Sequence, residues 1–304
     1  MGIAVLGSIN VDVTAYSARL PAPGETIHGE SYVLGLGGKG ANQAVAVARL
    51  GGAPDFVGRV GRDAFGDLAR RELSRYGVSL AGVATDEGAG TGIAIIAVDA
   101  SAQNCITVIA GANFRMTADD AGRLAPLAAQ GALLLQLEVP LAANIAAALR
   151  ARAEGALVIF DPAPVPKAPL PDELLGAVDV VTPNEVECES LTGIRPANAA
   201  DAARAAGVLA GRGIGRVVVK MGANGAYWRG PEGEGHQPRF KVEAIDTVAA
   251  GDCFNGGLAF ALAAGKRFGE AVRFASACGA LSTTRRGAAA AAPTLAEVER
   301  LLSA

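Results

Sequence analysis

Short apolar runs alternate with helical patterns along most of this chain. The runs are rich in Val, Ile and Leu and are apolar on both faces, which is typical of buried parallel strands. They lie at residues 3–6, 56–60, 132–137, 156–160, 178–182 and 216–220. Between them, apolar residues recur at i, i+3 or i+4, and i+7, as in 41–48, 141–149 and 202–209. This order predicts an α/β fold with a wound, mostly parallel sheet and right-handed crossovers.

Two regions, residues 11–36 and 91–112, interrupt the alternation. Their residues fit short antiparallel strands better than helices, and 91–100 with 103–110 resembles a hairpin that turns at Ser101 and Ala102. We therefore expect a single domain, 1–304, with a small β-sheet formed by about 12–36 and 91–112 that serves as a lid or a dimer contact. The alternative is a pair of ordinary edge hairpins.

Composition and charge exclude several classes of protein. Of the 304 residues, 51% are hydrophobic, 19% are charged and 40 are glycine, so a disordered chain is not expected. The 27 Lys and Arg against 30 Asp and Glu give a net charge of −3, which offers no broad positive surface to nucleic acid or anionic lipid. The chain begins with a strand rather than a basic signal region, and it has no apolar stretch of about 18 residues. We expect a soluble, cytoplasmic protein with reduced thiols and with neither a nucleic-acid nor a membrane partner.

The few cysteines and histidines leave little room for zinc or triad chemistry. The 4 cysteines lie far apart without a Cys-x-x-Cys pair. The 2 histidines, His28 and His236, stand in segments without a nucleophile-elbow pattern. The chemistry is therefore expected to depend on other residues.

A glycine-rich loop at 35–40 opens into the predicted helix 41–50. It satisfies the pattern G-x-G-x-x-G, but the first buried strand ends much earlier, near Gly7, and Gly40 stands where a Walker A loop needs Ser or Thr. The loop does supply bare backbone N–H groups and Lys39 to whatever docks at the helix start. A plain helix-entry turn explains the pattern equally well.

The segment 246–257 carries stronger chemistry. The apolar spacing after Gly251 is helical, so residues 249–252 are predicted to form a first helical turn with accessible N–H groups. Such a helix end favours an anion, yet Asp252 places a carboxylate in the same turn. That conflict is expected if a phosphoryl group passes between the N–H groups and a proton donor held by the carboxylate. Alternatively, Asp252 only complements the helix dipole.

These two segments resemble the signature regions of the PfkB-type sugar kinases. Residues 37–61 begin GGKGANQAVAVARLGG, and residues 246–257 read DTVAAGDCFNGG; further motifs at 7–12, 134–138, 161–164, 182–185 and 284–287 stand in the expected places. The resemblance covers essentially the whole chain, and GGKGANQA is similar to the ribokinase group in particular. It implies a ribokinase-like three-layer α/β fold with a β lid, a homodimer through that lid, and ATP-dependent phosphorylation of D-ribose at O5 with Mg²⁺.

The resemblance also implies roles for individual residues. Asp252 matches the catalytic base, with Ala250, Gly251 and Asp252 as the anion hole. The implied sugar site comprises Asn10, Asp12, Gly38, Lys39, Gly40, Ala41, Asn42, Glu138 and Asp252. The implied ATP site comprises Asn184, Lys220, Met221, Gly222, Ala223, Asn224, Gly225, Gly251, Asp252 and Ser276. In the Asn-x-x-Glu pattern at 184–187, Glu187 organises Mg²⁺ through water, and K⁺ or another monovalent cation is expected beside Asp246, Val248, Ser282, Arg285, Gly287 and Ala291.

Three residues depart from this pattern. Lys220 stands where some ribokinases have Thr, and we expect it to neutralise phosphate charge at the end of its strand. Ala291 stands where Ser is familiar and offers only its carbonyl to a cation. Cys253 replaces a common Thr beside the base; either it makes the enzyme sensitive to alkylation or it is a small packing residue.

Two other functions remain open at this point. One is a kinase for fructose, deoxyribose or an adenosine-like nucleoside on the same machinery; GGKGAN with Asn10, Asp12 and Glu138 favours ribose instead. The other is a sugar-binding regulator that has lost catalysis. The intact Asp252, with Asn184 and Glu187 present, argues against that second function.

Overall fold

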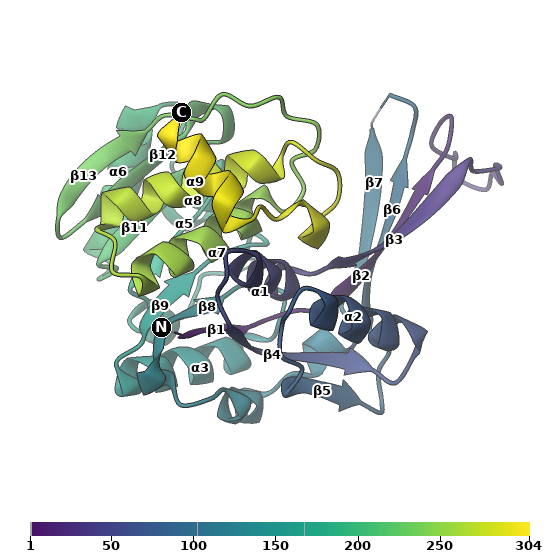
Figure 1. Cartoon of the computed structure of the whole chain (residues 1–304), viewed down its shortest axis with the longest axis horizontal. Helices are drawn as coiled ribbons and strands as arrows, with labels where there is room; N and C mark the ends of the chain where they lie inside the picture. The colour runs from purple at the N-terminus through teal and green to yellow at the C-terminus, as the bar shows by residue number, and fades with distance from the viewer. Residues whose placement is uncertain (1, 102, 167) are drawn as a thin grey trace.

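Two β-sheets of different size organise the structure, a computed structural model that describes residues 2–101, 103–166 and 168–304 (Figure 1). The larger sheet has nine strands, and its pairs are parallel from β11 to β5 and antiparallel from β11 through β13. In spatial order the strands are β13 (Gly233–Gln237), β12 (Ala226–Gly230), β11 (Arg216–Lys220), β10 (Val180–Val181), β9 (Leu157–Phe160), β8 (Gln130–Leu135), β1 (Gly2–Leu6), β4 (Pro54–Gly61) and β5 (Gly82–Asp86). The predicted wound, mostly parallel sheet is confirmed.

Helices cover both faces of the larger sheet (Figure 1). They are α1 (Lys39–Arg49), α2 (Ala64–Arg75), α3 (Leu141–Glu154), α4 (Asp172–Leu175), α5 (Glu185–Thr192), α6 (Ala199–Gly211), α7 (Ala250–Ala263), α8 (Phe268–Ser282) and α9 (Leu295–Ser303). Side chains of a strand point alternately to its two faces. Ile3 and Val5 therefore join one core with residues of α1, α7 and α8, and Ala4 and Leu6 join the other with residues of α3 and α6. Among the described residues, no helix is long and apolar enough to cross a membrane.

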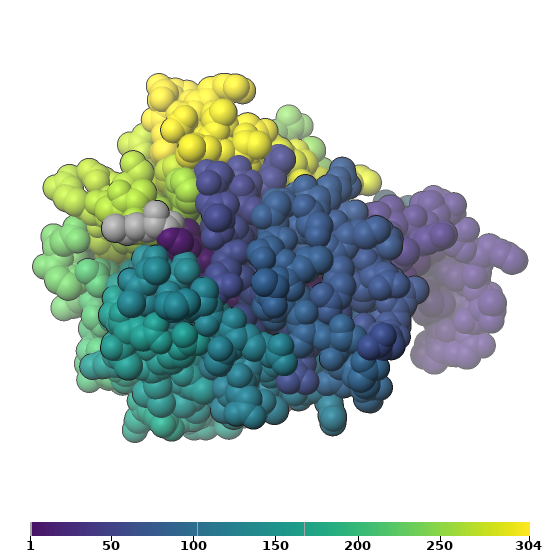
Figure 2. All heavy atoms as spheres, turned by 60° about the horizontal axis from the view of Figure 1, so that its bottom comes forward, coloured from purple at the N-terminus to yellow at the C-terminus, as the bar shows by residue number. Residues whose placement is uncertain are grey.

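The smaller sheet has four strands in the order β3-β2-β6-β7 and projects away from the helices (Figures 1 and 2). Its strands are β2 (Asn10–Tyr16), β3 (Ser31–Gly37), β6 (Gly92–Val98) and β7 (Asn104–Ile109). The predicted antiparallel pairs are confirmed, and a parallel pairing of β2 with β6 joins them. The predicted turn at Ser101 and Ala102 includes Ala102, which lies outside the described residues. The predicted boundary 91–112 included residues 111 and 112 in this sheet, which is wrong. These two residues begin the 3₁₀ helix η1 (Gly111–Arg115).

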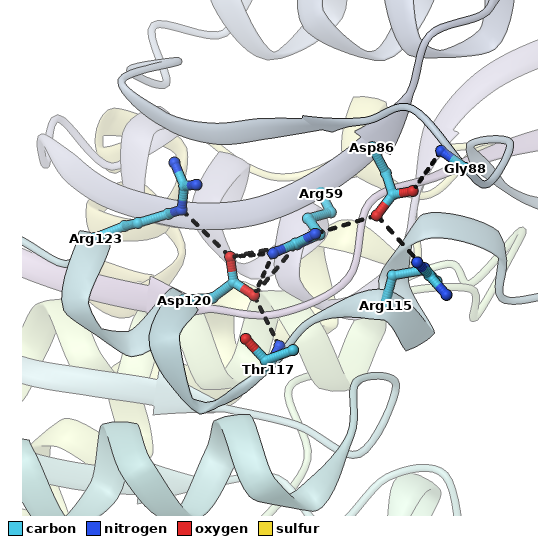
Figure 3. Close-up of polar contacts among 7 residues, drawn as sticks. All are labelled: Arg59, Asp86, Gly88, Arg115, Thr117, Asp120 and Arg123. Carbon is cyan, nitrogen blue, oxygen red and sulfur yellow. Dashed lines mark hydrogen bonds and ion pairs between the residues drawn. The ribbon is translucent and has the colours of Figure 1, made fainter.

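A cluster of charged side chains fastens the segment after the smaller sheet to the edge of the larger one (Figure 3). Arg59 of β4 donates to both carboxylate oxygens of Asp120, at 3.0 to 3.3 Å, and to Asp86 at 3.1 Å. Asp120 lies in the 3₁₀ helix η2 (Ala118–Arg123), is 1% exposed, and also accepts the N–H of Thr117. Because removing one partner of a buried ion pair leaves the other charge uncompensated, loss of either Arg59 or Asp120 alone is expected to destabilise the fold. The other 3₁₀ helices in the described ranges are η3 (Leu127–Ala129), η4 (Gly222–Asn224) and η5 (Ala289–Ala291).

Candidate active site

Five parallel strands end at the same edge of the larger sheet, and polar residues follow each of them. They are Ser8 and Asn10 after β1, Gln136 and Glu138 after β8, Asp161 after β9, Thr182 and Asn184 after β10, and Lys220 at the end of β11. In open α/β sheets, ligands bind outside the carboxyl ends of the strands. The helices α1 and α7 begin near this edge and bring their first turns to it, because side chains of α1 bond to Asp252 of α7.

Asp252 lies in the first turn of α7 and is buried, with 4% of its surface exposed. Its Oδ2 accepts a hydrogen bond from Nδ2 of Asn42 at 2.9 Å, and its Oδ1 accepts one from Nε2 of Gln43 at 3.2 Å. Burial raises the pKa of Asp252 to about 6; Lys39 opposes this shift, whereas Asp161 adds to it. The side chain is thus held in one orientation and takes up a proton more readily than an exposed carboxylate.

The N-terminus of α7 presents backbone donors beside that carboxylate. The helix begins at Ala250, one residue later than the predicted first turn, because Ala249 adopts a left-handed conformation with φ of 59°. The N–H of Ala250 donates to the Thr247 carbonyl at 3.3 Å. The N–H groups of Gly251 and Asp252 make no hydrogen bond to another described residue. Free donors at a helix start are suited to an anion.

The predicted sugar residues lie together between β2, α1 and the end of β8. Glu138 accepts hydrogen bonds from the Ser8 hydroxyl at 2.6 Å and from the backbone N–H of Lys39 at 2.9 Å. Burial raises the pKa of Asp12 to about 6, and Glu138 and Asp252 add to the shift, so these carboxylates share one environment. Asn10 accepts a bond from Asn113 at 2.8 Å.

The start of α1 closes on the loop after β1. Gly38 precedes the helix with φ of 87°, a conformation that favours glycine, and a Cβ on Gly40 would lie 2.6 Å from the backbone of Gly7. Ala41 donates its N–H to the Ser8 carbonyl at 2.9 Å. The helix begins at Lys39 rather than at residue 41, so Lys39 belongs to its first turn.

The predicted nucleotide residues lie beside α5 and β11. Asn184 forms an isolated parallel bridge with Lys220, and its side chain accepts the N–H groups of Val186 and Glu187 at 2.9 Å each. The carboxylate of Glu187 in turn accepts the N–H of Asn184 at 2.8 Å. The loop from Met221 to Gly225 is closed by the Met221 N–H donating to the Gly225 carbonyl at 2.8 Å, and it includes Gly222, Ala223 and Asn224. Ser276 lies on α8, where its buried hydroxyl has no hydrogen-bond partner among the described residues.

Comparison with known proteins identifies the family. A family model described as pfkB family carbohydrate kinase matches residues 2–295. The chain belongs to this family of carbohydrate kinases. A ribokinase of Haemophilus influenzae is 40% identical over 301 residues, which cover 99% of this chain and 98% of that protein. The predicted resemblance is confirmed.

Two further relatives bear on the substrate of this carbohydrate kinase. A deoxyribokinase of Salmonella typhi is 35% identical over 305 residues, covering 100% of this chain and 99% of that protein. A solved structure of an Arabidopsis thaliana ribokinase, complexed with ribose and ATP, matches with a TM-score of 0.92 and 33% identity and covers 100% of this chain and 99% of its own. The ribokinase-like fold is thereby confirmed.

Four of the residues expected around a monovalent cation in this carbohydrate kinase lie on the loops before α7 and after α8, whereas Ser282 ends α8 and Ala291 lies in η5. Asp246 accepts the N–H of Val248 at 3.0 Å and the N–H of Gly287 at 3.1 Å, so it joins the two loops. The side chains of Ser282 and Arg285 are engaged elsewhere, with the Gly279 carbonyl and with Glu297, and Ala291 is buried in η5. In the described part of the chain, no group of three or more His, Cys, Asp or Glu side chains could hold a metal ion.

Several residues of the kinase site received no role from the sequence. Gln43 and Asp161 contact the network around Asp252, Gln136 donates to Gln43, and Asn113 donates to Asn10. Asp161 and Gln136 each follow a strand that is apolar on both faces. A polar residue at that position is the signal that marks this edge of the sheet, whereas nothing in the sequence places Asn113 beside Asn10.

Proposed function

We propose that this carbohydrate kinase transfers the γ-phosphoryl group of ATP to O5 of D-ribose and so produces D-ribose 5-phosphate and ADP. The observation that carries the proposal is the buried Asp252 beside the free N–H groups of α7, with the polar residues Asn10, Asp12 and Glu138 close by. Phosphoryl transfer to a hydroxyl requires a base that takes the hydroxyl proton and, next to it, donors that bind the negatively charged phosphoryl group. The ribokinase relatives favour ribose as the acceptor.

The proposed reaction uses Asp252 as the general base. Its carboxylate takes the proton from the O5 hydroxyl, O5 forms a bond to the γ-phosphorus, and the bond from that phosphorus to the β–γ bridging oxygen breaks. ADP leaves with the electron pair, and the proton stays on Asp252. The N–H groups of Gly251 and Asp252 stabilise the negative charge of the transferring group, and losing one such donor typically costs about 10²–10³ in rate.

The sugar would be held by carboxylates, amides and backbone groups. Asp12 and Glu138 accept hydrogen bonds from hydroxyl groups, and Asn10 and Asn42 both donate and accept. Gly38, Gly40 and Ala41 let the backbone approach closely. Burial lowers the pKa of Lys39, but Asp252, Asp161 and Glu138 outweigh it and raise the pKa above the usual range. Lys39 therefore stays positively charged at the point where phosphate and sugar meet.

The proposed nucleotide site fits ATP with Mg²⁺ and a monovalent cation. Glu187 is buried and bonded to Asn184, so its carboxylate lies close to the proposed phosphates and suits a hydrated Mg²⁺. Burial raises its pKa, and Lys220 opposes that shift. When bound to ATP, Mg²⁺ supplies neutralisation of phosphate charge. Lys220 and the loop 221–225 would contact the nucleotide, with Ser276 on the neighbouring helix. K⁺ would be held at the loops that Asp246 joins.

The small sheet is proposed to act as a lid and as the contact between two copies of the chain. Its strand β2 carries Asp12 of the sugar site, so movement of the sheet would open and close that site. On one face of the sheet its apolar side chains are exposed, among them Val33, Ile106 and Val108. Contiguous exposed apolar surface of this kind indicates an interface. We also propose that the reaction takes place in the cytoplasm, where ATP is available and the four free cysteines would stay reduced.

Deoxyribose is the second candidate acceptor, and the full-length deoxyribokinase relative favours it. Fructose or a nucleoside would need a differently shaped sugar site on the same machinery. A purely regulatory sugar-binding protein is opposed by the intact Asp252.

The test is an ADP-release assay with ribose, deoxyribose, fructose and adenosine, with the phosphorylated product identified by mass spectrometry and NMR. Ribose is expected to give the highest kcat/KM, with phosphate on O5. Asp252→Asn is expected to lower kcat by about 10²–10⁴, because it removes the general base. Higher kcat/KM for another acceptor would overturn the ribose assignment, and wild-type turnover by Asp252→Asn would overturn the mechanism.

A further inference from the structure

An ion pair between Asp161 and Lys220 lies beside the proposed base. The proposed function gives Lys220 a contact with the nucleotide but gives Asp161 and the pair itself no role. Nζ of Lys220 donates to Oδ1 of Asp161 at 3.0 Å. The Asp161 side chain is 1% exposed and the Lys220 side chain 14% exposed, so both charges are largely removed from water. Burying two charges costs free energy that their attraction often does not recover, so stability alone is a weak reason for such a pair.

The pair is connected to the catalytic carboxylate by one side chain. Nε2 of Gln43 donates to Oδ2 of Asp161 at 3.3 Å and to Oδ1 of Asp252 at 3.2 Å. Its Oε1 accepts a hydrogen bond from Nε2 of Gln136 at 2.7 Å, which fixes the orientation of the Gln43 amide. Asp161, Gln43 and Asp252 therefore form a continuous buried network.

The other end of the pair reaches the proposed path of the phosphoryl group. A Cβ on Gly251 would lie 3.5 Å from Nζ of Lys220, so the ammonium sits directly at the N-terminus of α7. Lys220 also immediately precedes the loop 221–225, and its N–H donates to the Pro183 carbonyl at 2.8 Å. The lysine is thus placed between the proposed nucleotide loop and the anion-binding helix end.

We propose that Asp161 and Lys220 form a positioning pair for phosphoryl transfer. Asp161 holds the Lys220 ammonium at the N-terminus of α7, where it adds positive charge to the two backbone donors. Through Gln43, the same carboxylate fixes the orientation of Asp252. The inference rests on the proposed function, since it takes Asp252 as the base.

The test is a double-mutant cycle of Asp161→Asn and Lys220→Met, with kcat and KM measured for the best acceptor and for ATP. Asp161→Asn keeps the shape but removes the charge, and Lys220→Met keeps the aliphatic stem. Each single variant is expected to lower kcat by about 10²-fold, because a small displacement of reacting groups has that effect. The KM for the sugar is expected to change less than about threefold. The double variant is expected to be no slower than the slower single variant, because the two residues act as one unit.

The pH dependence of kcat separates positioning from structure. Asp252 is faced by Lys39 of α1, by Asp161 at the sheet edge, and by Asp12 and Glu138 on the sugar side. The ammonium of Lys220 lies next to Gly251, the residue before Asp252. Loss of the Lys220 charge is expected to move the acid limb of the profile to higher pH, and loss of the Asp161 charge to lower pH. Lys220→Arg is expected to restore most of the wild-type rate.

A matched control is Asp120→Asn, which removes the charge from another buried carboxylate of an ion pair (Figure 3). The hydrogen bonds of Asp120 are to Arg59 and Thr117, neither of which belongs to the proposed site. It is expected to lower the melting temperature and to leave kcat and the pH profile unchanged.

If Asp161→Asn does not fold, Lys220→Met and Lys220→Arg still give the rate and the pH shift. Multiplying effects in the double variant, or wild-type kcat in Lys220→Met while Asp252→Asn is inactive, would overturn the pair and leave the proposed function standing. An active Asp252→Asn would overturn the base and the pair together.

Discussion

The protonation of Asp252 is set by its surroundings rather than by its residue type. Its pKa is raised from 3.8 to about 6, mainly by burial; Asp161 and Glu138 contribute to this rise, and Lys39 opposes it. A base with a pKa near the working pH is efficient, because it is ionised and still binds a proton strongly. Asp12 has a pKa of about 6 for related reasons, so the two carboxylates titrate as neighbours.

The acid side of the pH profile follows from these values. Asp252 must be ionised to accept a proton, so kcat is expected to fall as the pH drops through about 6, approaching a tenfold loss per pH unit below it. We expect Asp12→Asn to weaken sugar binding and yet to retain this acid limb in kcat. Initial rates at saturating ATP and sugar between about pH 4.5 and 8 measure both effects. A rate that stays constant down to about pH 5 would contradict the raised pKa of the base.

At the level of elements, prediction was accurate where packing alone decides the structure. Apolar runs such as 216–220 became strands because burial on both faces leaves few alternatives. The edge strands β12 and β13 were not predicted, because they carry Arg229, Glu234 and His236 and are stabilised by pairing with β11 rather than by an apolar pattern. The predicted strand at 178–182 is shorter in the structure, because only Val180 and Val181 pair with the neighbouring strands in β10.

The same difference holds for the candidate site. The sequence placed Asn10, Glu138 and Asp252 in one site by resemblance, and the structure brings them to one edge of the sheet. It gave no role to Gln43 or Asp161, because their contacts join residues that are far apart in the chain. Such contacts depend on the order of strands in the sheet, which hydrophobic periodicity does not specify.

The loops beside α7 are where a monovalent cation would act. Asp246 joins the loop before α7 to Gly287, and Ala249 is held in a left-handed conformation at the start of the helix. A cation bound by the carbonyls of these loops would fix the N–H groups of Gly251 and Asp252 in place. We therefore expect turnover to be higher in K⁺ than in Li⁺ at equal ionic strength, and Asp246→Ala to reduce this difference. Equal turnover in the two salts would contradict the cation site.

At the scale of the whole molecule, the small sheet is the part whose surface the rest of the chain leaves uncovered (Figures 1 and 2). Val33, Ile96 and Ile106 lie in one row across it, with Thr14 between the first two. Val33 and Ile106 are 55% and 53% exposed, so the row faces solvent in a single copy. A second copy, placed sheet against sheet, would bury such a row and hold Asp12 over the sugar.

The oligomeric state tests this arrangement. The wild-type chain is expected to sediment at twice its mass of 30.4 kDa at micromolar concentration. Ile106→Asp places a charge in the proposed interface, and because burying an isolated carboxylate is costly, it is expected to give a monomer with a raised KM for the sugar. Val208→Asp is the matched control, since it changes an exposed apolar residue of α6, outside the small sheet, and should leave the dimer intact.

A wild-type monomer, or a dimer that survives Ile106→Asp with an unchanged KM, would show that the sheet is not the interface. A monomer with wild-type KM would instead separate the two roles, because the sheet would then join the copies without contributing to closure over the sugar.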